Sequence, residues 1–227
     1  MDFKYYLFDL DNCLIHYPNF VDFFDNLLVE NLKNFSKNTP PQKERKELLY
    51  AEEKYNDILR QWGISDCELF WKLFNEIDFK NRKKLIEKSE IFLFKKVKSV
   101  LQRLRDENKK VALISNTPNY IVDYILEKFR LNKYFDEVLR IDYNKNQNLA
   151  KPSPYGILSI LDKLKYNSES SNAIMIGDSM VDIVAAKRAN IYGCLIVREA
   201  SNETLGFEVW DHNPDFIIYS LDDLLEL

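Results

Sequence analysis

Short apolar segments alternate with helical segments along the second half of the chain, and this order constrains the fold more than any other feature. The strand-like runs are "KVALIS" (110–115), "FDEVLRI" (135–141), "NAIMIGD" (172–178), "YGCLIVR" (192–198) and "DFIIY" (215–219). The segments with helical spacing are 119–129, 154–164, 180–190 and a short final helix over 220–227. Strands that alternate with helices predict βαβ units, and therefore an α/β fold with a parallel sheet covered by helices on both faces.

The chain opens with another predicted strand, "YYLFDLDNCLI" (5–15), which Asp9 and Asp11 interrupt. Side chains two residues apart on a strand share a face, so the two carboxylates can lie close together. Like charges in an apolar setting repel each other and resist desolvation. Such a costly pair needs an explanation in terms of function.

Residues 17–94 contain almost no strand pattern. Apolar residues at helical spacing predict helices over 19–35, 43–62, 65–77 and 81–94. A segment of this length is too long for an ordinary loop. We therefore predict a core domain formed by 1–16 and 95–227, with a helical domain inserted at 17–94.

Composition and charge describe an ordinary globular protein. Hydrophobic residues make up 46% and charged residues 30% of the chain, and the net charge is −4. This weak acidity gives no support to a nucleic acid polymer or an anionic membrane as the main partner.

The three cysteines are far apart and form no CxxC pair, so neither a disulfide framework nor a zinc site is expected. The first residues, "MDFKYYLFDLDN", lack the pattern of a signal peptide, and no apolar run approaches the roughly 20 residues of a membrane-spanning helix. These features predict a soluble, cytoplasmic protein.

Polar side chains follow several of the predicted strands at the point where each strand ends. In an open parallel sheet, ligands bind in the crevice outside the carboxyl ends of the strands, so we expect these side chains to converge. They are Asp9 and Asp11, Ser115 and Asn116, Lys151 (before "PSP"), and Asp178 with Asp182 in "IGDSMVDI".

This set of side chains suits a divalent cation and a phosphate group. Several carboxylates can be held together when a hard cation such as Mg²⁺ lies among them. Ser115 can donate a hydrogen bond to a phosphate oxygen, and Lys151 supplies a compact positive charge. One carboxylate of the pair Asp9 and Asp11 can then act as nucleophile, and the other as general acid and base.

The chain resembles the haloacid dehalogenase-like hydrolases over nearly its whole length. The matching motifs are "FDLDNCLI" (family pattern DxDx[TV]), "LISN", "AKPSP" and "IGDSMVDIVAAKRAN", and their order and rough spacing agree with the family. The resemblance implies a Rossmann-like core and a helical, type-one cap inserted between the first two motifs.

The resemblance also implies a role for each acidic residue. Asp9 would be the nucleophile that becomes phosphorylated, and Asp11 would protonate the leaving group and then activate water. Asp178 would hold Mg²⁺ together with Asp9 and the backbone carbonyl of Asp11. Asp182 would either ligate the metal through water or orient Lys151.

The remaining motif residues would bind the phosphate group. Ser115 and Lys151 would contact it, with Asn116 nearby. Each of these roles competes with a simpler one, since Ser115 can cap a helix ahead of Pro118 and Lys151 can be a solvated loop residue. Asp182 lies early in a predicted helix, where an acidic residue favours the helix dipole in any case.

The chain departs from the family pattern after the second aspartate, where Asn12 and Cys13 replace the usual Gly-Thr. Asn adopts positive φ angles more readily than most residues, so the turn can be kept. A similar "DxDNCLY" spelling occurs in pyrimidine 5′-nucleotidase-like members of the family.

The predicted function is therefore a Mg²⁺-dependent phosphatase that acts on a small phosphorylated metabolite through an aspartyl-phosphate. A nucleoside monophosphate, phosphoglycolate and a sugar phosphate all remain open as substrates. One alternative is a phosphomutase of the same family, and another is a phosphate-ligand binding protein without catalysis. Asp11 argues against a haloacid dehalogenase, which has no use for an acid at this position.

Overall fold

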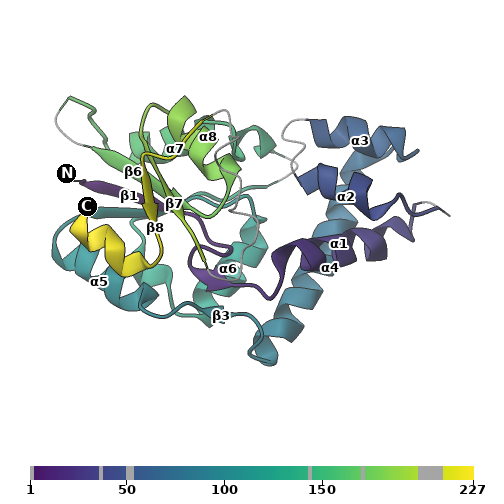
Figure 1. Cartoon of the computed structure of the whole chain (residues 1–227), viewed down its shortest axis with the longest axis horizontal. Helices are drawn as coiled ribbons and strands as arrows, with labels where there is room; N and C mark the ends of the chain where they lie inside the picture. The colour runs from purple at the N-terminus through teal and green to yellow at the C-terminus, as the bar shows by residue number, and fades with distance from the viewer. Residues whose placement is uncertain (1–2, 36–37, 50–53, 143–144, 170–171, 199–211) are drawn as a thin grey trace. The chain divides into compact units, whose positions relative to one another are not determined.

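The computed structural model describes residues 3–35, 38–49, 54–142, 145–169, 172–198 and 212–227. It separates into two compact units, one formed by 1–16 with 93–227 and the other by 17–92 (Figure 1). Their boundaries differ by two residues from those of the predicted insertion at 17–94.

The first unit contains a sheet of six parallel strands, which confirms the predicted α/β class. In spatial order the strands are β5 (Glu137–Val138), β4 (Lys110–Leu113), β1 (Tyr5–Phe8), β6 (Ala173–Gly177), β7 (Tyr192–Ile196) and β8 (Phe216–Ile218). The order reverses at β1, because β4 and β5 extend the sheet on one side and β6 to β8 on the other. Ligands of open α/β sheets bind at such a reversal.

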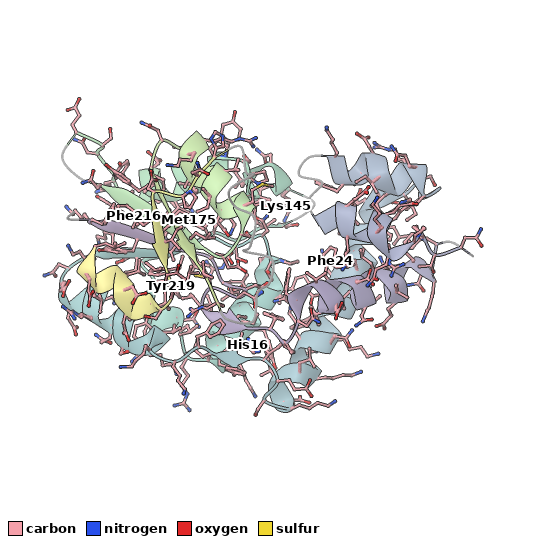
Figure 2. All side chains as sticks on the ribbon, in the orientation of Figure 1. His16, Phe24, Lys145, Met175, Phe216 and Tyr219 are labelled. Carbon is pink, nitrogen blue, oxygen red and sulfur yellow. The ribbon has the colours of Figure 1, made fainter. Side chains whose placement is uncertain are left out.

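Helices cover both faces of this sheet, which explains why all four residues of β1 are buried. Leu7 of β1 shares a hydrophobic core with Met175 of β6 and with residues of α7 (Tyr155–Lys163) and α8 (Met180–Arg188). Figure 1 shows α7 and α8 on one side of the sheet and α5 (Val97–Asp106) on the other. Figure 2 shows Met175 of β6 in the sheet, between these two groups of helices.

The described residues of this unit also form α6 (Asn119–Lys128) and the 3₁₀ helix η5 (Leu221–Glu226), where helices were predicted. The short 3₁₀ helices η2 (Asn132–Tyr134) and η3 (Gln147–Leu149) were not predicted. Residues 135–141 were expected to form a strand, but only β5 is regular. Backbone hydrogen bonds to β4 extend only from the N–H of Asp136 to that of Leu139, because β5 is the edge of the sheet and has a neighbour on one side.

The second unit is helical and has its own core. Its helices are α1 (Phe20–Leu32), α2 (Gln42–Leu49), α3 (Tyr55–Gln61) and α4 (Cys67–Glu87). Their apolar faces meet in a cluster that includes Leu28, Leu59 and Phe70, and Phe24 packs against it (Figure 2). Among the described residues, no helix of either unit has the length and apolar character that crossing a membrane requires.

Two of the predicted helices in this segment were wrong in their extent. The expected break at 78–80 is absent, because Asp78 and Arg82 form a buried ion pair (2.7 Å) within α4 and make these polar residues compatible with a continuous helix. The helix expected over 81–94 ends at Glu87, where Ser89 adopts a left-handed φ of 61°. The chain then forms β3 (Phe92–Leu93), which pairs with β2 (Ile15–His16).

The segment expected as one helix over 43–62 contains two helices, α2 and α3. Residues 50–53 lie outside the described part of the chain. Helix α3 ends at Gln61, and Gly63 follows with a φ of 82°, a conformation that glycine often adopts just after a helix.

Candidate active site

The two N-terminal aspartates lie on a tight turn that follows β1. The backbone N–H of Asp9 donates to the carbonyl of Ile176 at 2.8 Å, which fixes the end of β1 against β6. The chain then turns at once, since Asn12 adopts a φ of 52° and the N–H of Leu14 donates to the carbonyl of Leu10. Asn12 therefore takes the conformation that was expected of the residue replacing glycine.

Lys151 lies at the centre of the site, although it is 142 residues from Asp9 in the sequence. Its Nζ is 2.6 Å from Oδ1 of Asp9 and 2.5 Å from Oδ1 of Asp182, and its side chain is 3% exposed. Burial alone lowers the pKa of Lys151, but the carboxylates of Asp182 and Asp9 raise it above its usual value. The ammonium group therefore stays charged.

Three aspartates form the acidic cluster of the site. One carboxylate oxygen each of Asp9, Asp178 and Asp182 lies within 4.8 Å of the others. Burial, opposed by Lys151, raises the pKa of Asp9 to about 7, and burial together with Asp9 raises that of Asp178 well above its usual value. Carboxylates crowded in this way become more stable when a divalent cation lies among them.

Asp182 differs from the other two members, because hydrogen bonds within the protein occupy both of its carboxylate oxygens. Oδ1 contacts Lys151, while Oδ2 accepts from the backbone N–H of Ser179 (3.1 Å) and from its hydroxyl (2.6 Å). A Cβ atom on Gly177 would lie 2.1 Å from Cγ of Asp182, so the last residue of β6 must be small. Asp182 therefore connects Lys151 to the backbone at the start of α8.

Asp11 is half-buried, and its carboxylate is not part of the acidic cluster found among the described residues. The hydroxyl of Thr117 donates to Oδ2 of Asp11 at 2.9 Å. Ser115 lies two residues before Thr117 and is buried, and its Oγ accepts a hydrogen bond from the N–H of Thr117 at 3.1 Å. The loop that follows β4 thus reaches the turn that follows β1.

The side chain of Asn116 forms two hydrogen bonds with the backbone of Lys151. Its amide group donates to the carbonyl of Lys151 and accepts from the N–H of Lys151, both at 2.7 Å. The pair of hydrogen bonds holds the backbone that carries Lys151. The expectation that Asn116 lies near a bound phosphate stays a prediction.

The sequence reasoning missed Thr117 and Arg198. Arg198 follows β7, donates to the carbonyl of Cys13 at 2.5 Å and places its guanidinium carbon 3.9 Å from the centroid of the Phe94 ring. Both residues lie just after the carboxyl end of a parallel strand. The criterion that selected Ser115, a polar side chain at such a position, would therefore also have selected them.

Comparisons with known proteins agree with this arrangement. Residues 6–196 match the family described as "Haloacid dehalogenase-like hydrolase". Phosphoglycolate phosphatase of Vibrio parahaemolyticus is 34% identical over 135 residues, which are 60% of this chain and 56% of that protein. A provisionally named pyrophosphatase of Caldanaerobacter subterraneus is 31% identical over 132 residues, 58% of this chain and 56% of that protein. The matched segments thus span little more than half of these relatives.

Solved structures extend the likeness in fold to the whole chain. The HAD phosphatase of Thermococcus onnurineus superposes with a TM-score of 0.62 at 23% identity, over 98% of this chain and 96% of that chain. At this level of identity the likeness concerns the fold alone.

The family match, however, includes the aspartate turn, the loop after β4, Lys151 and the acidic residues that follow β6. The chain belongs to the haloacid dehalogenase-like hydrolase family.

Proposed function

We propose that the protein is a Mg²⁺-dependent phosphatase that hydrolyses a small phosphomonoester through a phosphoryl group carried on Asp9. The observation that carries this proposal is the buried ammonium group of Lys151, which lies 2.6 Å from a carboxylate oxygen of Asp9. A cation beside a nucleophilic carboxylate provides a place for the negative charge of a phosphate group.

In the first step, a carboxylate oxygen of Asp9 attacks phosphorus and the bond from phosphorus to the ester oxygen breaks. The electron pair of that bond goes to the ester oxygen, which takes the proton of Asp11 and leaves as an alcohol. Asp11 suits this role, because it lies on the same turn as Asp9 and its carboxylate stands outside the acidic cluster. The carboxyl oxygens of Asp11 are therefore not needed as metal ligands.

In the second step, the carboxylate of Asp11 takes a proton from water, and the water oxygen attacks phosphorus. The bond from phosphorus to the oxygen of Asp9 breaks, which releases inorganic phosphate and restores the Asp9 carboxylate. Asp11 ends the cycle protonated, so that one residue serves first as acid and then as base.

The acidic cluster fits Mg²⁺, a hard cation that binds carboxylate oxygens. Asp9 and Asp178 would hold it, together with the backbone carbonyl of Asp11, while Asp182 holds Lys151. When bound, the ion would neutralise charge on the phosphate oxygens and on the crowded carboxylates. The raised pKa values of Asp9 and Asp178 support this assignment, because they mark carboxylates that lack a sufficient positive charge.

Ser115 and Lys151 are the proposed phosphate-binding residues. Asn116 would act on the phosphate indirectly, because its side chain holds both the backbone N–H and the carbonyl of Lys151. The helical unit at 17–92 is the proposed cap, which would select the substrate and exclude water from the reaction.

A panel of phosphomonoesters tests the proposal. Phosphate release would be measured with Mg²⁺, with a chelator, and with Asp9→Asn, a variant of nearly the same shape that lacks the nucleophile. We expect release that requires Mg²⁺ and is lost in Asp9→Asn. Release that persists in this variant, or in the presence of the chelator, would contradict the mechanism.

The same panel distinguishes the candidate substrates. The relatives named phosphoglycolate phosphatase favour phosphoglycolate as the substrate. A relative of similar identity is provisionally named a pyrophosphatase, so the names of relatives do not select one substrate. Nucleoside monophosphates belong in the panel because of the "FDLDNCLI" spelling. A phosphomutase would transfer the phosphoryl group to a sugar phosphate instead of releasing phosphate.

A further inference from the structure

We infer that Thr117 is a positioning residue that holds Asp11 in the orientation required for proton transfer. This inference deepens the proposed function and rests on it. Thr117 Oγ1 donates to Oδ2 of Asp11 at 2.9 Å, although the two residues are 106 positions apart in the sequence.

The surroundings of Thr117 give its hydroxyl little freedom. The residue is 7% exposed, and its backbone N–H donates to Oγ of Ser115, itself 2% exposed. Pro118 follows directly and precedes α6, so the chain on the other side of Thr117 is restricted as well. A hydroxyl held in this way is a fixed point that can orient the carboxylate of Asp11.

The place of Asp11 in the site makes its orientation important. Asp11 is half-buried, and its carboxylate lies outside the acidic cluster in which Lys151 contacts Asp9. A carboxyl group that rotates away from the ester oxygen cannot deliver its proton, and misplacement by about 1 Å can lower a rate by roughly 100-fold. The hydrogen bond from Thr117 to Oδ2 restricts the rotation of the Asp11 carboxyl group about its bond to Cβ.

The inference predicts a specific dependence on the leaving group. An alkyl phosphate such as phosphoglycolate releases a strongly basic alkoxide, which requires the proton of Asp11. An aryl phosphate such as p-nitrophenyl phosphate releases a stable phenolate without protonation. Since kcat/KM reports the steps up to formation of the phosphorylated enzyme, a misplaced acid lowers this constant far more for the alkyl ester than for the aryl ester.

The test compares Thr117→Val, which keeps the shape and removes the hydroxyl, with Thr117→Ser, which keeps the hydroxyl. Thr39→Val, at an exposed position of the helical unit, is the matched control for the exchange itself. For each protein the quantity measured is the ratio of two kcat/KM values, one for the alkyl phosphomonoester of the panel that the wild type prefers and one for p-nitrophenyl phosphate. The ratio does not depend on the folded fraction, so a loss of stability in Thr117→Val does not affect the result.

We expect the ratio to fall by at least about tenfold in Thr117→Val, a part of the roughly 100-fold or larger effect of general acid catalysis. We expect Thr117→Ser to restore it and Thr39→Val to leave it unchanged. Equal losses for both esters in Thr117→Val would overturn the inference and leave the phosphatase in place. A wild-type protein that is inactive on the whole phosphomonoester panel would instead overturn the proposed function, and the inference with it.

Discussion

Replacing Lys151 by methionine tests the electrostatic arrangement of the site most severely. Methionine has a similar length but no charge, so the change removes the ammonium group that lies 2.6 Å from Asp9 and 2.5 Å from Asp182. Both carboxylates are buried, with 7% and 1% of their residue surface exposed. The variant must either desolvate these charges without a partner or protonate them.

The expected loss follows from this geometry. Removing one partner of a buried ion pair costs about 3–5 kcal/mol in the free energy of unfolding. For a chain of 227 residues this corresponds to a decrease in Tm of roughly 6–20 °C. The loss should be smaller at pH 5 than at pH 7.5, because the pKa of Asp9 is already raised to about 7 and loses the lowering effect of Lys151 in the variant. At pH 5 this carboxyl is therefore neutral and needs no partner.

Urea denaturation of the metal-free protein, measured with a chelator at both pH values, provides the free energies. Asp182→Asn and the double variant complete a thermodynamic cycle, in which we expect a coupling energy above about 1 kcal/mol between Lys151 and Asp182. A loss below about 1 kcal/mol at pH 7.5, or a coupling energy near zero, would refute the assignment of Lys151 to the centre of the site.

Three further predictions follow from neighbouring residues. Because the pKa of Asp9 is raised from its ordinary 3.8 to about 7, the free energy of unfolding of the metal-free protein should fall by up to about 4 kcal/mol between pH 4 and pH 7. Mg²⁺ should restore this stability at pH 7.5. Urea denaturation at a series of pH values measures the effect, and a free energy that does not change with pH would contradict the prediction. Gly177→Ala should lower kcat/KM in the phosphate-release assay by at least about tenfold, since the new Cβ would displace the carboxylate of Asp182; activity like that of the wild type would speak against this close approach. Asn12→Val should cost about 1–3 kcal/mol in urea denaturation, whereas Asn12→Gly should cost little, because the φ of 52° strains a β-branched residue; equal costs would remove the argument from backbone strain.

The fold could be predicted from the sequence because its strands are short and apolar and alternate with helices. Buried parallel strands lack polar residues, so runs such as 172–178 are visible without any tertiary information. The extent of α4 could not be predicted in the same way. The sequence predicted a break at 78–80, and the buried ion pair between Asp78 and Arg82, which the sequence does not reveal, makes a continuous helix possible there.

The candidate site was predictable to a similar degree. Asp9, Ser115, Lys151 and Asp178 each follow a predicted strand or belong to a recognisable motif, and the structure brings their segments to one edge of the sheet. The division of labour among the polar residues was not predictable. Whether the amide of Asn116 contacts a phosphate or the backbone of Lys151 depends on the path of two loops that are 35 residues apart in the sequence.

The most direct test of the central claim is the detection of a phosphoryl group on Asp9. The protein would be mixed with Mg²⁺ and its preferred phosphomonoester, quenched in acid during turnover and digested, and the peptide containing Asp9 would be analysed by mass spectrometry. We predict a peptide heavier by one phosphoryl group that loses this mass with hydroxylamine, as an acyl phosphate does, and that is absent from Asp9→Asn. Sustained phosphate release with no phosphoryl group on Asp9, or with one on another residue, would contradict the account.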